Sequence, residues 1–387
     1  MSTNLTTDNT ALSDVLARHR FHELDGVRGI AAMMVAIGHC VITVFAIPAL
    51  TTTGLAAAAV VGIINGGIAV DLFFIMSGFF LAGMIESMRG QGILAYYARR
   101  LARLAPPAIV SVVLLYIYTL LFMGPGIEGG TLAAPRYVQF HSDTYHMRLP
   151  ALLLNLGLIR HTVNPVLWTI RLEIFISLLY PAVMWLHWWR TGTLYRAGLL
   201  AVILIAAVAL NAHQKLGIDV THYLYMFYAG TLVRDMAPAI RRLPGFAPGL
   251  IAGAGVVLMA VTGELVPLHN THPLRFDMPV TLGGVMLIAM LAHAGMPRAR
   301  ALMCSAPIQF LGRISYSVYL ANWLAIHTLG QIMLARNLPG SIGLAATVTL
   351  LTLTTVLLLL PLGWVLHALV ERPAVAWSRR LGQAWAA

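Results

Sequence analysis

Apolar runs long enough to cross a lipid bilayer recur along the whole chain, and they constrain its fold more than any other feature. A helix needs about 20 residues to cross the hydrocarbon core, because it rises only ~1.5 Å per residue. Of the 387 residues, 59% are hydrophobic and 10% are charged, and a soluble domain of this length does not bury so much apolar surface. The sequence therefore predicts an all-α, polytopic membrane helix bundle of about ten transmembrane helices. The expected spans are 25–47, 61–86, 105–124, 165–189, 194–212, 219–235, 247–266, 277–295, 307–334 and 342–370.

Basic residues divide unequally between the two sides of these spans. Eighteen arginines fall on one side, whereas six arginines and Lys215 fall on the other. Cytoplasmic loops are enriched in Lys and Arg, so this division predicts that both chain termini are cytoplasmic, which agrees with an even number of spans. The formal net charge of +11 lies in short loops between apolar runs. That placement indicates membrane topology and does not favour binding to nucleic acid.

Polar segments flank a single membrane domain. We expect a cytoplasmic N-terminal tail over residues 1–20, a membrane domain over 21–372 and a cytoplasmic C-terminal tail over 373–387. The two cysteines, Cys40 and Cys304, form neither a CxxC motif nor the spacing of metal ligands. No metal site is therefore expected.

The first span carries two basic side chains on one helical stripe. Arg28 and His39 are eleven residues apart, which corresponds to about three turns and ~16 Å along a helix. With Arg28 at one membrane boundary, His39 lies near the middle of the bilayer. A titratable group at that depth is costly, so it faces a protein interior or a watery cavity. The sequence is compatible both with a structural histidine bonded to a neighbouring helix and with a reaction centre.

Three arginines precede the third span. Arg99 and Arg103 are four residues apart and share a helix face, and Arg100 stands between them. One interpretation is a cluster that sets the topology and binds lipid phosphates. The other is a clamp for a phosphate-bearing ligand that arrives from the cytoplasm, because the planar guanidinium group binds phosphate with two hydrogen bonds.

Two carboxylates lie inside apolar spans. Asp71 lies in the outer half of the second span, and Glu173 lies near the middle of the fourth. Arg171 precedes Glu173 by two residues, and side chains at that separation do not face each other on a helix. Each therefore needs a partner on another helix. Structural ion pairing and participation in a site are both compatible with this pattern.

Aromatic and amide side chains also mark the fourth and ninth spans. Trp168 lies at the start of the fourth span, and Tyr316, Tyr319 and Asn322 recur at helical spacing in the ninth. Such a stripe suits either packing at an interface or the lining of a substrate site. We treat these residues, together with Arg171, as candidate substrate-binding residues.

Six segments along the chain resemble one known family. In order, they are LDGVRGIAAMMVAIGH, DLFFIMSGFFL, ARRLARLAPP, LWTIRLEIFISLLYP, FLGRISYSVYL and LVERP. Together they resemble acyltransferase family 3, integral-membrane O-acyltransferases that modify bacterial polysaccharides, lipopolysaccharide and some secondary metabolites. The resemblance extends from about residue 21 to residue 381, so it covers the whole expected membrane domain.

The resemblance implies ten core helices in the bacterial cytoplasmic (inner) membrane. It also implies transfer of an acyl group from cytoplasmic acyl-CoA, usually acetyl-CoA, to a hydroxyl group. One departure is Arg171, which stands where many members carry a small residue and which bears on the acceptor pocket. The family's signature residues fall on Arg28 and His39, on Arg99, Arg100 and Arg103, and on Trp168 and Glu173.

These residues predict a mechanism for acyl transfer. An alcohol needs a base within hydrogen-bond reach, and imidazole titrates near neutral pH, so we expect His39 to take the acceptor proton. Asp71 or Glu173 would orient His39, in the manner of a catalytic dyad. Arg28 and the three arginines before the third span would bind the donor. An acyl-histidine intermediate is the alternative to direct attack.

The expected partners are acyl-CoA, a glycan or other hydroxyl-bearing acceptor, and membrane lipids. The rival function is a proton-coupled transporter or flippase of a polar lipid or small solute, because intramembrane Asp, Glu and His suit a proton path. A carrier of that kind often contains inverted repeats, and none is evident in the sequence. A purely structural scaffold would leave the buried ionisable groups unexplained.

Overall fold

The computed structural model of the protein describes most of the membrane domain. Every regular element among the described residues is helical, so the all-α prediction is confirmed for that part of the chain. The expected tail 1–20 and residues 385–387 lie outside it. The described residues are 21–42, 65–88, 90, 92–123, 143–144, 146–211, 220–265 and 274–384.

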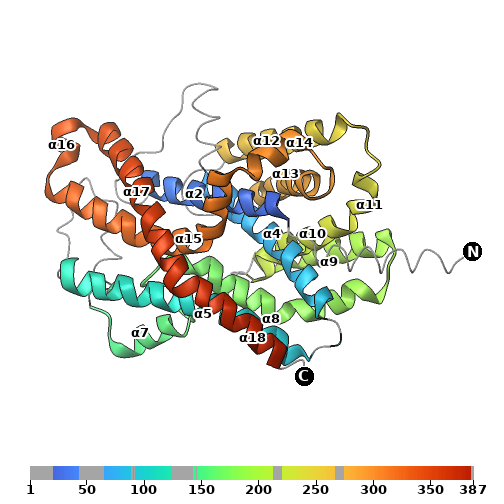
Figure 1. The fold of residues 1–387 in the computed structure, drawn as a ribbon, viewed down its shortest axis with the longest axis horizontal. Coiled ribbons are helices and arrows are strands. Elements are labelled where there is room, and N and C mark those ends of the chain that lie inside the picture. Colours follow the sequence, from blue (N-terminus) through green and yellow to red (C-terminus); the bar gives the residue numbers. More distant parts are fainter. Residues whose placement is uncertain are drawn as a thin grey trace, which may run out of the picture.

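Long helices dominate the structure, and short ones link them (Figure 1). The long helices are α2 (His22–Ile42), α4 (Gly66–Ser87), α5 (Ile93–Tyr118), α8 (Leu167–Trp189), α9 (Thr193–Asn211), α10 (Val220–Asp235), α12 (Ala247–Leu265), α13 (Leu274–His293), α15 (Ala306–Ala335) and α17 (Leu344–Leu366). The shorter ones are α7 (Leu149–Leu156), α11 (Ala237–Ile240), α14 (Pro297–Met303), α16 (Leu338–Ile342) and α18 (Arg372–Ala384), with π-helical segments over Thr119–Met123 and His367–Glu371.

Seven helices within the described residues are long and apolar enough to cross a membrane. Three other expected spans, 25–47, 219–235 and 247–266, form α2, α10 and α12, which do not meet that criterion within the described residues. The apolar part of α12 and the 16-residue α10 are too short. The chain is thus a multi-pass helical protein, whereas the count of ten spans and the side of the termini stay predictions. The seven helices are Gly66–Ser87, Ile93–Phe122, Leu167–Trp189, Thr193–Leu210, Phe276–His293, Ala306–Ala335 and Leu344–Leu381.

Helix α4 lies at the centre of the bundle and contacts α2, α8, α10 and α13. It approaches α10 most closely where Gly78 faces the Phe227 carbonyl and Gly230 faces the Ile75 carbonyl. A Cβ atom on either glycine would overlap the facing backbone, so only glycine permits this crossing. The close contact fixes the rotation of α4 about its axis and hence the direction of its other side chains.

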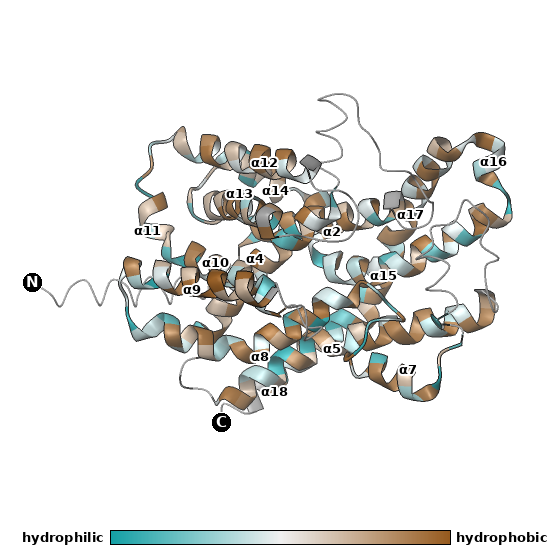
Figure 2. Ribbon diagram, turned by 180° about the vertical axis from the view of Figure 1, so that it is seen from behind, coloured by the Kyte–Doolittle hydropathy of each residue, from teal (hydrophilic) through white to brown (hydrophobic). Residues whose placement is uncertain are grey.

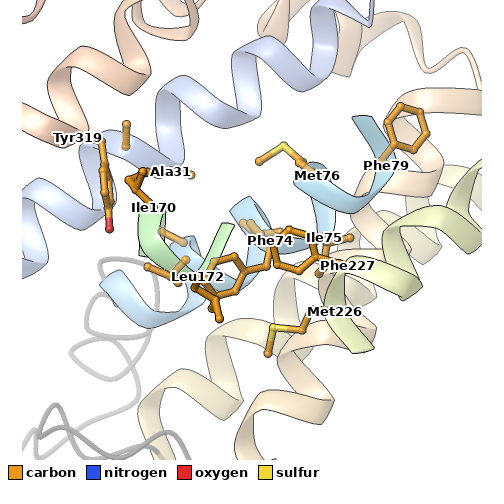
Figure 3. Packing of buried hydrophobic residues seen from close by; sticks show 14 of the residues in the cluster. Ala31, Phe74, Ile75, Met76, Phe79, Ile170, Leu172, Met226, Phe227 and Tyr319 are labelled. Carbon is orange, nitrogen blue, oxygen red and sulfur yellow. The ribbon is translucent and has the colours of Figure 1, made fainter. Parts of the chain in front are cut away.

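Apolar side chains fill the spaces between these helices. Figure 3 shows Phe74 and Ile75 of α4 beside Met226 and Phe227 of α10. The rings of Phe74 and Phe227 stack, with centroids 5.3 Å apart and an interplanar angle of 28°. Offset ring pairs of this kind add to the stabilisation from burial. This core holds α4, α8 and α10 as a rigid wall behind the polar region described next.

One region of the membrane domain brings together several charged side chains. Most of the helical surface is hydrophobic, whereas hydrophilic stretches appear where α5, α8 and α18 lie together (Figure 2). The π-helical segment His367–Glu371 connects the end of α17 to the start of α18, so the three form one continuous helix. π-helical turns within a longer helix are frequent at functional sites. This one places Glu371 at the polar region.

Candidate active site

A cavity of about 500 Å³ occupies this polar region, between α2, α4, α5, α8, α15 and α18. It runs along α4 from Val70 to Ser87, a distance of ~26 Å on a helix of this rise. Seven of the residues predicted from the sequence line this arginine-lined cavity: Arg28, Arg99, Arg100, Arg103, Glu173, Tyr316 and Tyr319. The structure therefore brings the whole predicted donor-binding set to one place.

The two ends of the arginine-lined cavity differ in chemistry. At the outer end, where α4 ends and α5 begins, the lining includes Ser87 and Arg99. At the inner end the lining includes Phe73, Thr169 and Tyr319, and the Tyr319 hydroxyl lies 2.8 Å from Thr169 Oγ1. The outer end is thus cationic, whereas the inner end is aromatic and hydroxyl-bearing.

Arg99 and Arg103 both face the arginine-lined cavity, as their spacing predicts. Arg103 is exposed at its wall, and neither guanidinium group has an ion-pair partner among the described residues. Guanidinium groups that line a cavity without an ion-pair contact favour the binding of an anion, and a phosphate group suits their planar geometry.

Arg100 behaves differently from its two neighbours. Its Nη2 atom contacts Glu173 Oε1, and its Nε atom donates to Ser177 Oγ at 3.0 Å. Ser77 of α4 donates to the same Glu173 oxygen at 3.1 Å. The buried ion pair thus joins α4, α5 and α8, and it satisfies the charge of Glu173. The hydrogen bonds of this carboxylate go to Arg100 and Ser77, and not to His39.

His39 pairs with an amide. Its Nδ1 atom lies 3.2 Å from Asn322 Oδ1, and its ring meets the Trp323 ring edge-on with centroids 5.9 Å apart. The Asn322 amide donates through Nδ2 to the Tyr319 carbonyl at 2.8 Å, which directs Oδ1 toward the histidine. Because Oδ1 only accepts, Nδ1 must carry the proton, and Nε2 of a neutral ring keeps its lone pair.

His39 does not line the arginine-lined cavity, but it lies just beyond the inner end. Tyr316 donates to the Leu104 carbonyl of α5 at 2.7 Å, and Tyr319 stands one turn further along α15. Asn322 follows after about one more turn and holds His39. Along α15, Tyr316 therefore lines the cavity wall, Tyr319 lines the cavity floor, and Asn322 contacts His39 of α2.

Asp71 belongs to another cluster. It is buried and lies close enough to Asp277 of α13 for their charges to interact. Asp277 Oδ2 is in turn 2.7 Å from His222 Nε2 of α10. This buried group links α4, α10 and α13, whereas the His39 ring bonds to Asn322. Neither His222 nor Asp277 was predicted as a site residue from the sequence, where the four-residue spacing of His272 and Asp277 was discounted as a chance match.

Trp168 and Arg171 do not line the arginine-lined cavity. Trp168 packs against Phe74 and Tyr223, with ring centroids 6.1 and 5.7 Å away. The Arg171 guanidinium carbon lies 5.8 Å from the Phe175 ring centroid, and its buried Nε atom has no hydrogen-bond partner among the described residues. Burial, and then the charge of Arg171, lower the pKa of His161.

Several lining residues are absent from the set predicted from the sequence. Arg234 of α10 pairs with Glu86 at 2.8 Å. Glu371 accepts a hydrogen bond from Ser317 at 2.6 Å and lies 3.0 Å from His367 Nδ1. All of these charged residues lie at the ends of expected spans, where a charge in the sequence is interpreted as a topology signal. The described part of the chain holds no group of His, Cys, Asp and Glu arranged for a metal ion.

Comparison with known proteins gives the chain a family. A family model described as an acyltransferase domain matches residues 21–364, which is most of the chain. The chain belongs to acyltransferase family 3. This membership supports the acyltransferase prediction over the proton-coupled carrier, and the multi-pass helical fold suits a membrane-bound member.

Two curated relatives of this family 3 acyltransferase carry names that describe acyl transfer. One, BcsY of Komagataeibacter xylinus, is named as a membrane-bound transacylase; it is 25% identical over 95% of this chain and 86% of its own length. The other is the peptidoglycan O-acetyltransferase OatA of Listeria monocytogenes, 24% identical over 67% of this chain. The match spans 44% of OatA, less than half of that relative. No solved structure matches the chain significantly.

Proposed function

We propose that the protein transfers an acyl group, acetyl in the first instance, from acyl-CoA to a hydroxyl group of a glycan acceptor. The observation that carries this proposal is the arginine-lined cavity, in which Arg99 and Arg103 have no ion-pair partner among the described residues. Its inner end adjoins the pair formed by His39 and Asn322. The cavity is cationic at its outer end and aromatic and hydroxyl-bearing at its inner end. A donor with phosphate groups at one end and a thioester at the other matches this change.

The donor would enter from the cationic outer end. Its phosphates would bind Arg99 and Arg103, and Arg28 would meet the part of the donor nearest α2. The thioester arm would then run along the cavity toward Thr169 and Tyr319. The ~16 Å that separates Arg28 from His39 along a helix is a distance that an extended arm spans. The arginine distribution along the sequence supports entry from the cytoplasm of a bacterium, with the enzyme in the inner membrane.

In the reaction we propose, His39 acts as the general base. Its Nε2 lone pair takes the proton of the acceptor hydroxyl while that oxygen attacks the thioester carbonyl. A carbon–oxygen bond forms, the carbon–sulfur bond breaks, and the proton on His39 passes to the departing CoA thiolate. Asn322 would orient the ring through Nδ1, the position that a carboxylate takes in many dyads. Glu173 would keep Arg100 and the cavity wall in place.

The acceptor class rests on the relatives. The Listeria relative is named as a peptidoglycan O-acetyltransferase, and this name supports a glycan hydroxyl as the acceptor that we propose for this chain. Trp168 and Arg171 of α8 lie outside the arginine-lined cavity, so they would not contact the donor. We propose that they serve the acceptor side.

Binding of acetyl-CoA to the detergent-purified protein tests this proposal. Calorimetry would compare the wild type with the Arg99→Ala/Arg103→Ala variant and with an Arg372→Ala/Arg380→Ala control. The control removes two charges from α18 that do not line the cavity. We expect the first variant to bind at least about tenfold more weakly and the control to bind like the wild type, because a charge-assisted hydrogen bond contributes about 1.5–3 kcal/mol. A wild type that binds neither acetyl-CoA nor a longer acyl-CoA would contradict the proposal.

A further inference from the structure

Helix α18 forms part of the wall of the arginine-lined cavity, although it lies beyond the residues that the family model matches. The match to the family ends at residue 364, and α18 covers Arg372–Ala384. With α17 it forms one long rod that crosses the molecule diagonally in Figure 1, and it packs along α5. The segment that the sequence predicts as a C-terminal tail is thus helical through residue 384 and docks on the donor-binding region.

One face of α18 points into the cavity. Val375, Ser378 and Arg379 line it, and their i, i+3 and i+4 spacing places them on a single helix face. Ser378 is buried and donates to the backbone carbonyl of Arg99 at 2.7 Å. This hydrogen bond fixes α18 against the start of α5. Arg380 is exposed and does not line the cavity.

The charges at this outer end are not balanced. Arg379 has no ion-pair partner among the described residues, as is also true of Arg99 and Arg103. The other lining arginines are neutralised: Arg28 lies 3.8 Å from Asp25, Arg100 contacts Glu173, and Arg234 pairs with Glu86. Within the described part of the chain, Arg99, Arg103 and Arg379 are thus the lining arginines without an ion-pair partner, and Arg103 lies one turn deeper than Arg99.

We propose that α18 is an integral part of the donor site and that Arg379, together with Arg99, binds the 3′-phosphate of the donor's adenosine. This inference rests on the proposed function. Coenzyme A carries a diphosphate next to its arm and a single phosphate on the ribose, at the end farthest from the thioester. Arg103 lies deeper and suits the diphosphate, whereas Arg99 and Arg379 lie at the outer end.

The experiment compares coenzyme A with dephospho-coenzyme A, which lacks only the 3′-phosphate. Calorimetry would measure both affinities for the full chain in detergent, for the wild type, Arg379→Ala and the neighbouring control Arg380→Ala. We expect the wild type to bind coenzyme A about tenfold to hundredfold more tightly than the dephospho form. Arg379→Ala should lose most of that preference while it keeps the affinity for dephospho-coenzyme A, and Arg380→Ala should keep the preference.

Four results would overturn the inference. If Arg379→Ala retains the full preference for coenzyme A, the 3′-phosphate binds elsewhere. If Arg380→Ala loses as much of this preference as Arg379→Ala, the effect comes from general surface charge. A wild type without any preference excludes a 3′-phosphate site. If the wild type binds neither compound, the proposed donor fails, and this inference fails with it. Thermal unfolding of each variant would show that folding is intact, which the exposure of both arginines predicts.

Discussion

His39 on α2 and Asn322 on α15 face each other across the helix interface, with Nδ1 and Oδ1 3.2 Å apart. The amide cannot turn without losing its second hydrogen bond, from Nδ2 to the Tyr319 carbonyl. The neutral amide of Asn322 therefore holds the His39 ring in one orientation, and this contact also sets the direction of Nε2. Tyr319 also forms the floor of the arginine-lined cavity, so one turn of α15 joins the donor region to the histidine.

Asn322→Leu is expected to lower kcat while it leaves the affinity for acetyl-CoA nearly unchanged. Leucine fills similar space but cannot accept the hydrogen bond from His39, so the imidazole loses its orientation. Mispositioning of a general base costs part of the ~10²–10⁴-fold that such a group contributes. Steady-state kinetics with a fixed glycan acceptor would measure the change.

The control for that variant lies two turns along the same helix. Among the described residues, Thr328 donates to the Leu324 carbonyl of its own helix at 2.8 Å and to no other group, so Thr328→Val should leave kcat unchanged. An Asn322→Leu enzyme with wild-type kcat would show that His39 needs no orientation from α15.

Arg100 and Arg103 stand three residues apart but should respond to substitution in different ways. Arg100→Ala leaves the Glu173 carboxylate without its cation inside the bundle, and breaking a buried pair costs about 3–5 kcal/mol. Arg103→Ala removes a group without an ion-pair partner in the described chain, so it should spare stability and weaken donor binding at least about tenfold.

Thermal unfolding in detergent, combined with acetyl-CoA titration, would separate these two effects. Loss of stability in both variants, with no change in donor affinity for Arg103→Ala, would give Arg103 a structural function instead.

Gly230→Val is expected to destabilise the bundle. Its Cβ would overlap the Ile75 carbonyl and force α4 and α10 apart, and overpacking costs about 1–3 kcal/mol or more. Gly253 of α12 has open space where a Cβ atom would lie, so Gly253→Val provides a matched control. A thermal shift assay in detergent should show a lower Tm for the first variant alone. Equal Tm values would mean that α4 and α10 do not cross as closely as the structure indicates.

Much of the fold follows from local sequence patterns. Apolar length predicts the helices, and the i, i+4 spacing predicts that Arg99 and Arg103 share a face, as both line the arginine-lined cavity. These features depend on helix periodicity alone, and this periodicity can be read from the order of residues within one segment.

The partners of the buried charges could not be predicted in the same way. Arg100 meets Glu173 across α5 and α8, and Asp71 meets the cluster of His222 and Asp277 across three helices. Such pairs depend on which faces pack together, and a set of apolar spans allows many arrangements. For the same reason the sequence offered two carboxylates for His39, whereas the structure gives its ring an amide partner.

The role of His39 as general base is tested by measuring both acetyl transfer and donor binding in His39→Ala. His39 does not line the arginine-lined cavity, so acetyl-CoA should bind to the variant as tightly as to the wild type. Transfer of labelled acetyl groups to a glycan acceptor should fall by about 10²–10⁴-fold, because the hydroxyl loses its base. Cys40→Ala alters the next residue on α2, which points ~100° away, and should leave both measurements unchanged. Normal acetyl transfer by His39→Ala, with intact donor binding, would contradict this role.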